Sequence, residues 1–298
     1  MLQILTHSGR MSALLFLCGT CLSSLLYAQE SRQAAANPAR PAPLSTDAGI
    51  SPELLTILQT WETQSGTVTR SRGEFSRIEY DKIMLSAKCA LGKYWYEGPD
   101  KGRMDFSPNE AATGKEVKKR NQVFTCNPDQ AKTWICNGKE ILDIDIVKKE
   151  YNRIKIPAQY QGQNIADGPL PFLFGMNAQK MQQRYMLELG SLHDPNKIIH
   201  IIAYPKLAAE QREYRVAEVL LDPTTYLPQA VQLMDTTGNK ETVYVFSKHD
   251  KVSGPWLPTA PWNPPMLFYK EITNQTAEPT TLEREAARPF NTQGIMLR

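Results

Sequence analysis

The sequence predicts an α+β fold in which one large, curved antiparallel sheet, a half-barrel, is covered on its concave face by helices. About a dozen short apolar segments alternate with turn residues between positions 68 and 246. One amphipathic helix is expected before the first strand and another after the predicted strand 151–156. No internal repeat is present. A sheet of that size tends to curl, so it would enclose a groove or a cavity.

Residues 1–28 indicate an export signal. Arg10 is the only formally charged residue in this segment, an apolar run follows it, and Ala28 offers a small residue for cleavage. Lipidation at Cys18 or Cys21 is an open alternative, although the residue before each cysteine suits such cleavage poorly. We therefore expect an exported protein of the periplasm or cell envelope.

The rest of the chain divides into three parts by composition. Residues 29–49 are rich in Ala, Pro and small polar residues and predict a flexible tether. A folded domain is expected over residues 50–272. Residues 273–298 predict a tail with a short helix over 281–288.

The first helix of the domain is expected to begin at Pro52. Ser51 suits the N-cap, and Pro52 suits the first helical position. Four apolar residues then share one helical face: Leu54, Ile57, Leu58 and Trp61. A second helix is expected over 177–185, with Asn177 as its cap and Ala178, Met181 and Tyr185 on one face.

Turn chemistry separates the predicted strands. Asn137-Gly138 is typical of a type I′ hairpin, and tight turns join antiparallel neighbours because parallel pairing needs a long crossover. A Pro- and Trp-rich strap over 254–266 follows the last strand. The predicted strands are 73–85, 87–96, 102–106, 121–126, 132–136, 140–146, 151–156, 185–189, 197–204, 214–221, 229–234 and 242–247.

Several function classes are disfavoured by composition and motifs. With 34 Lys and Arg against 31 Asp and Glu, the net charge of +3 lacks the basic excess of a nucleic-acid-binding protein. The four histidines have no metal-ligand spacing: His7, His193, His200 and His249. No HExxH, GxSxG, P-loop or GxGxxG motif occurs, so no cofactor and no metal are expected.

Three cysteines follow the signal: Cys89, Cys126 and Cys136. An oxidising compartment allows one disulfide and one free thiol, and buried unpaired cysteines are the alternative. Cys126 and Cys136 are expected on neighbouring strands, but the register does not obviously join them. The pairing therefore stays open.

Asp143 and Asp145 lie two residues apart on a predicted strand, so their side chains face the same side about 7 Å apart. Such a pair could perform glycosidase chemistry. The stronger interpretation is a solvent-facing strand surface, because Leu142, Ile144 and Ile146 would occupy the other face.

The run from Pro169 to Met176, PLPFLFGM, is the most unusual stretch. The side chains of such runs usually fill space in the hydrophobic core. The functional interpretation is the mouth of an apolar cavity, for which bulky and flexible side chains are suited. The hypothetical ligand-binding residues are Leu58, Trp61, Phe172, Phe174, Met176 and Met181.

Two hairpins carry a family resemblance. Residues 92–106, GKYWYEGPDKGRMDF, resemble a strand–turn–strand segment of the LolA/LolB-like periplasmic lipoprotein carriers, and 134–141, WICNGKEI, resembles a second hairpin of that superfamily. Residues 203–206, 219–222 and 227–228 fit its later strands. An uncharacterised group of exported planctomycete proteins shares residues 134–138, 168–175, 184–185 and 226–228.

The resemblance implies a half-barrel whose concave side holds acyl chains, with Arg103 in the place of a hairpin arginine that acts as a structural partner. An acyl chain gains about 0.8 kcal/mol per buried methylene. The favoured hypothesis is an exported, non-enzymatic carrier or binding protein for a lipid, an acylated protein or another apolar ligand, with contact to a membrane surface.

Two alternatives remain. One is a structural or interaction module of the cell envelope whose core is filled by its own side chains. The other is a hydrolase that uses Asp143 and Asp145, or His193.

Overall fold

The computed structural model describes residues 50–156, 158, 161–162, 172 and 177–272. Within them a single 14-stranded sheet forms in the order β14-β8-β7-β6-β3-β2-β1-β13-β12-β11-β10-β9, with β5 on the free edge of β2 and β4 beside β5. The path does not close. The predicted signal, tether and tail helix lie outside the described residues.

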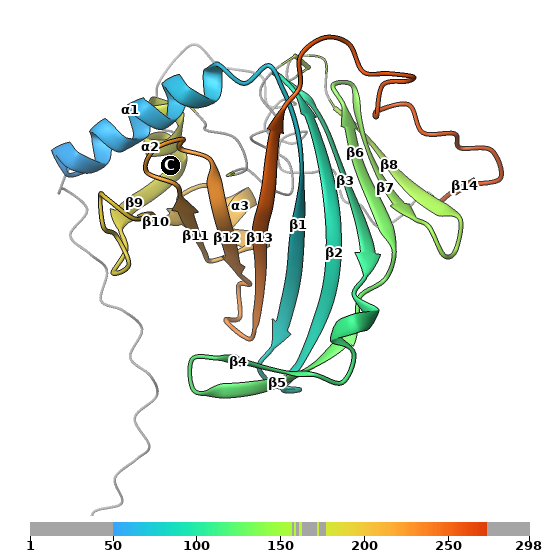
Figure 1. Cartoon of the computed structure of the whole chain (residues 1–298), viewed down its shortest axis with the longest axis horizontal. Coiled ribbons are helices and arrows are strands. Elements are labelled where there is room, and N and C mark those ends of the chain that lie inside the picture. The colour runs from blue at the N-terminus through green and yellow to red at the C-terminus, as the bar shows by residue number, and fades with distance from the viewer. Residues whose placement is uncertain (1–49, 157, 159–160, 163–171, 173–176, 273–298) are drawn as a thin grey trace, which may run out of the picture. The chain divides into compact units, whose positions relative to one another are not determined.

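The strands run as follows: β1 (Arg70–Asp81), β2 (Ser86–Glu97), β3 (Lys101–Pro108), β4 (Glu116–Lys119), β5 (Gln122–Pro128), β6 (Lys132–Asn137), β7 (Glu140–Asp145), β8 (Glu150–Lys155), β9 (Tyr185–Leu189), β10 (Ile199–Pro205), β11 (Val216–Leu221), β12 (Pro228–Met234), β13 (Lys240–Lys251) and β14 (Lys270–Glu271). The helices are α1 (Pro52–Gly66), α2 (Ala178–Arg184), α3 (Ala208–Glu213) and the short 3₁₀ turn η1 (Glu110–Ala112). Figure 1 shows α1 and α2 together on the side of the sheet nearest β9 to β12.

The expected α+β class with a mainly antiparallel sheet is confirmed. A tight turn joins β6 to β7 at Asn137-Gly138, as the sequence predicts, and tight turns also join β1 to β2 and β12 to β13. Two pairings in the described sheet are parallel, β2 with β5 and β8 with β14. Neither β4, β14 nor α3 was expected from the sequence, because each is too short to show a clear periodicity.

The register defines two faces of the sheet. Phe75 lies opposite Gly92, Gly92 opposite Phe106, and Phe106 opposite Lys132, so these residues share one face, which we call the inner face. The inner face packs against α1 and α2 through the largest core cluster. The opposite, outer face has two smaller clusters, one beneath the β4–β5 hairpin and one beneath the strap over 254–266.

Arg103 lies on the outer face and fastens the strap. Its guanidinium donates to Asp105 on the same strand at 2.7 Å and to the Pro261 carbonyl at 3.0 Å, and it lies over the Trp95 ring at 5.4 Å. The side chain therefore has structural partners on both the sheet and the strap.

Two expectations about the strands are wrong, one about the length of the first strand and one about which strands are neighbours. The predicted strand over 73–85 extends too far, because β1 ends at Asp81 and residues 82–85 form a turn. Cys126 and Cys136 are not on neighbouring strands, because β5 pairs with β2 and β4 whereas β6 pairs with β3 and β7. The disulfide joins Cys89 to Cys126, and Cys136 is a buried free thiol.

Candidate functional site

Helix α1 lies over the inner face through one apolar stripe. The Ser51 hydroxyl accepts a hydrogen bond from the Leu54 amide at 3.2 Å, which satisfies one of the free donors at the helix start. The buried side chains are the four that the helical spacing predicts: Leu54, Ile57, Leu58 and Trp61. The sequence therefore determines both where α1 begins and which side faces the sheet.

The structure brings together four of the six residues predicted to bind a ligand. Leu58 and Trp61 of α1, Met181 of α2, and Phe172 belong to one core cluster, and each is at most 1% exposed. Phe174 and Met176 lie outside the described residues. In this conformation the four side chains are shielded from solvent.

Large aromatic rings form the floor beneath α1. Phe75 meets Phe106 edge-on, with ring centroids 5.3 Å apart. Gly92 makes room for this floor, since a Cβ there would lie 2.1 Å from the Phe75 ring. Gly73 does the same for Tyr94, whose ring would lie 2.4 Å from a Cβ. Glycines on adjacent strands thus let two aromatic rings lie directly against the backbone of the neighbouring strand.

A few polar contacts hold α1 at its rim. The Glu62 carboxylate accepts from the Asn177 amide at 2.6 Å and from the Ala178 backbone N–H at 3.0 Å, which joins α1 to α2. At the other end, Glu53 pairs with Nε2 of His193 at 3.1 Å. The Glu53 side chain is 55% exposed, so water competes for this contact and it holds α1 only weakly. We call these contacts the α1 clasp.

Next to the aromatic floor, the inner face also holds a buried cation. Arg77 on β1 makes ion pairs with Glu79 and Asp129, and its guanidinium lies 5.9 Å from the Phe106 ring centroid and 6.0 Å from that of Tyr244. The Arg77 side chain is only 9% exposed. Sequence reasoning missed this cluster, because an arginine in an alternating strand normally indicates the solvent side.

At the β6–β8 end the inner face becomes polar. A pocket of about 250 Å³ opens there, lined by Gln130, Ala131, Lys132, Asp143, Asp145, Lys148, Glu150, Tyr151, Asn152 and Ile272. It contains the predicted carboxylate pair, while Leu142 and Ile144 are buried on the other side of β7. The alternation agrees with the interpretation of the pair as a strand surface over Leu142 and Ile144, whereas Ile146 follows β7 and is 39% exposed.

Asp145 stabilises the turn that follows β7, at the edge of that pocket. Its carboxylate accepts hydrogen bonds from the backbone N–H groups of Lys148 at 2.8 Å and Val147 at 3.0 Å, which closes the turn after β7. The Lys148 backbone N–H is the largest reason that the pKa of Asp145 lies below its ordinary value. A carboxyl group held ionised in this way is a poor general acid.

The third residue of the hydrolase hypothesis lies elsewhere. His193 follows β9, at one end of the strand order, whereas Asp143 is on β7 near the other end. The fold therefore does not assemble His193 with the carboxylate pair. Among the described residues no group of three or more His, Cys, Asp or Glu side chains could hold a metal ion, and none of their helices has the length and apolar character to cross a membrane.

Comparison with known proteins gives likeness of fold at low identity. No protein-family model and no curated protein matches the chain. A DUF1329 family protein from Desulfovibrio piger is 11% identical over 70% of this chain and 96% of its own, with a TM-score of 0.39. A LolA superfamily protein from Nitrosomonas europaea is 5% identical over 66% and 94%, with a TM-score of 0.32.

The Mycobacterium tuberculosis lipoprotein LppX is 11% identical over 68% of this chain and 98% of its own, with a TM-score of 0.34. Likeness of this extent carries no argument about what the chain binds. The chain's own residues must therefore support any function.

Proposed function

We propose that this chain is an exported, non-enzymatic binding or carrier protein for a lipid, an acylated protein or another apolar ligand. The ligand would enter between α1 and the inner face, among Leu58, Trp61, Phe172 and Met181. The observation that supports this proposal is how α1 is held: an apolar stripe on an aromatic floor, with a few rim contacts in the clasp. Such a helix can lift as a unit and expose a dry, apolar surface.

The energies of opening and binding are comparable. Lifting α1 exposes four large side chains at roughly 1.5–3 kcal/mol each, or about 6–12 kcal/mol in total. An acyl chain with about 14 methylenes would gain roughly 11 kcal/mol on burial in their place. A long-chain lipid could therefore replace the helix contacts, whereas a short-chain acid could not.

Native mass spectrometry of the full chain after gentle purification tests this proposal, together with titration by a fluorescent long-chain fatty acid. We expect a bound species and saturable fluorescence. Leu58→Asn should weaken binding at least tenfold, and Gln59→Asn, on the exposed side of α1, should leave it unchanged. A protein that stays empty and ignores the fatty acid refutes the proposal.

The packing of the core favours a second candidate, a structural or interaction module of the cell envelope. Leu58, Trp61, Phe172 and Met181 are at most 1% exposed, so the module would need no ligand to complete its core. Cross-linking in intact cells should then capture a protein neighbour, and the fatty-acid titration should fail. Capture of no neighbour would count against this candidate.

A hydrolase is the least supported function, and the pocket on β6–β8 supplies its test. Broad activity screening should show no turnover that depends on the carboxylate pair. Activity that is present in the original chain and lost in Asp143→Asn would instead establish the pocket as catalytic.

A further inference from the structure

The turn between β1 and β2 exposes three consecutive large apolar side chains. The exposed fractions are 70% for Ile83, 71% for Met84 and 48% for Leu85. A run of adjacent exposed apolar residues on a soluble protein marks an interaction site more often than an isolated one does. These residues form a projecting tip rather than a groove, because they lie where two paired strands reverse.

Hydrogen bonds hold this turn so that its side chains face outward. Oδ1 of Asp81 accepts from the backbone N–H groups of Ile83 at 3.0 Å and Met84 at 2.9 Å. The Leu85 carbonyl accepts from the Thr125 N–H of β5 at 3.1 Å. The exposure is therefore built into the turn and does not result from a frayed end.

The backbone at Leu85 is unfavourable for its side chain. Leu85 has a φ of +48°, in the left-handed region where Gly or Asn is normally found. A residue retained despite such strain suggests a use for its side chain. The Leu85 side chain is 48% exposed, so packing in a core does not compensate for the strain.

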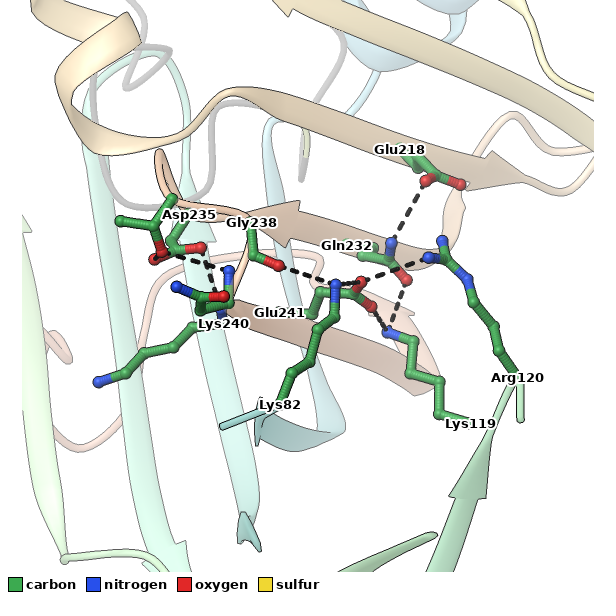
Figure 2. A network of polar contacts seen from close by, with 11 residues as sticks. Lys82, Lys119, Arg120, Glu218, Gln232, Asp235, Gly238, Lys240 and Glu241 are labelled. Carbon is green, nitrogen blue, oxygen red and sulfur yellow. Dashed lines mark hydrogen bonds and ion pairs between the residues drawn. The ribbon is translucent and has the colours of Figure 1, made fainter. Parts of the chain in front are cut away.

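Positive charge gathers beside the turn. Figure 2 shows Lys82, Lys119 and Arg120 converging on one carboxylate, that of Glu241, with N···O distances of 2.6, 2.5 and 3.6 Å. We call these three residues the cationic cluster. The Glu241 side chain is 1% exposed, and the half-buried Glu218 also lies close enough to interact with the charge of Arg120.

The solvent side of the same end is also mostly basic. Lys88 on β2 has a 61% exposed side chain that lies 3.8 Å from the Glu79 carboxylate, and Lys118 on β4 is exposed. The Arg120 side chain is 64% exposed. The nearby Glu116 is the exposed acid on β4. An apolar tip surrounded by cations is complementary to a surface that is apolar within and anionic outside.

We propose that this end of the sheet docks on a bilayer surface containing anionic lipids. Ile83, Met84 and Leu85 enter below the headgroups, while the exposed Arg120 and Lys118 lie against lipid phosphates. A bilayer suits a convex tip because it adapts to the inserted side chains, whereas a protein partner would need a matching cavity. This inference does not depend on an apolar ligand beneath α1, and failure of the fatty-acid titration leaves it intact.

The test places a reporter on the tip of the full chain. Cysteine is introduced by Met84→Cys and, as a matched control, by Leu192→Cys; Leu192 is 59% exposed and follows β9 at the opposite end of the strands. Each variant is labelled with a dye whose emission shifts to the blue in hydrocarbon. Cys18 and Cys21 are replaced by Ser in both variants. The native Cys136 is buried and should escape labelling.

We expect a blue shift at position 84 with vesicles of phosphatidylcholine containing 30% phosphatidylglycerol. Vesicles of phosphatidylcholine alone should give little shift, and position 192 should give none. Lys118→Gln and Arg120→Gln should each lower the apparent partition coefficient about fivefold. Leu85→Asn should lower it as well, without lowering the melting temperature.

Three outcomes overturn the proposal. One is no shift at position 84 with anionic vesicles, and another is an equal shift at position 192. The third is an equal shift at position 84 with polyglutamate, which would show that the surface selects acidic polymers rather than a bilayer. The Leu85→Asn melting curve distinguishes lost membrane contact from lost folding.

Discussion

Removing the disulfide by Cys89→Ala/Cys126→Ala should lower the free energy of unfolding by about 4 kcal/mol beyond the loss of the two buried sulfur atoms. The two cysteines are 37 residues apart in sequence, and the chain-entropy model gives about 4 kcal/mol for closing a loop of this length at 25 °C. The bond also fastens β5 to β2, and through the β4–β5 hairpin it positions the exposed Lys118 and Arg120. The loss should therefore appear both in stability and in the tip's response to anionic vesicles.

Guanidinium unfolding followed by tryptophan fluorescence measures this loss. Cys136→Ala is the matched control, since it removes a buried sulfur without opening a loop and should cost about 1 kcal/mol. Burial raises the pKa of the Cys136 thiol, so this residue should resist alkylation in the native protein at neutral pH. If the double variant, corrected by twice the control, lost less than 1 kcal/mol, or if peptide mapping found Cys136 in the bond, the reasoning would be refuted.

Three other changes test the fold. Glu241→Gln should cost about 3 kcal/mol in guanidinium unfolding, because it leaves two largely buried lysines, Lys82 and Lys119, without their carboxylate partner. Burial opposes the charge of Glu241, but hydrogen bonds from two lysines outweigh burial and hold the pKa of Glu241 below the ordinary 4.5. The stabilisation from the ionised carboxylate is complete above about pH 5 and is lost on acidification. The variant should therefore lose less stability on acidification than the original chain does. Trp61→Ala should cost about 3–5 kcal/mol, whereas the exposed Gln59→Ala should change stability by less than about 0.5 kcal/mol. Gly138→Ala should cost roughly 1–2 kcal/mol, since Gly138 has a φ of +87° and a Cβ would lie 2.5 Å from the Asp100 carboxylate; equal melting temperatures would contradict this.

Local patterns were enough to predict the main elements. The stripe from Leu54 to Trp61 and the Ser51 cap define α1, and Asn177 caps α2 as expected, with its side chain accepting from two backbone N–H groups. The Asn137-Gly138 pair joins β6 to β7 as a tight hairpin. Each of these signals arises within a few residues, where capping, turn conformation and side-chain spacing act directly.

The candidate site was predicted in part for the same reason. Leu58, Trp61 and Met181 lie on the buried stripes of α1 and α2, and Phe172 joins them in the core. Whether that space holds a ligand stays a prediction. The Asp143 and Asp145 alternation was also correctly interpreted as a strand surface, although the pocket that they line depends on β6 and β8 beside them.

By itself, then, the sequence determined the helices, most of the strands and the antiparallel class, because these follow from short-range periodicity and turn chemistry. Only the tertiary structure decided that β5 pairs in parallel with β2, that Cys89 meets Cys126, and that the end of the predicted first strand is an exposed apolar turn. These features depend on which strand edge is free and on which residues meet across long stretches of chain. No local pattern encodes that choice, since the same strand can pair with several partners until the whole sheet is assembled.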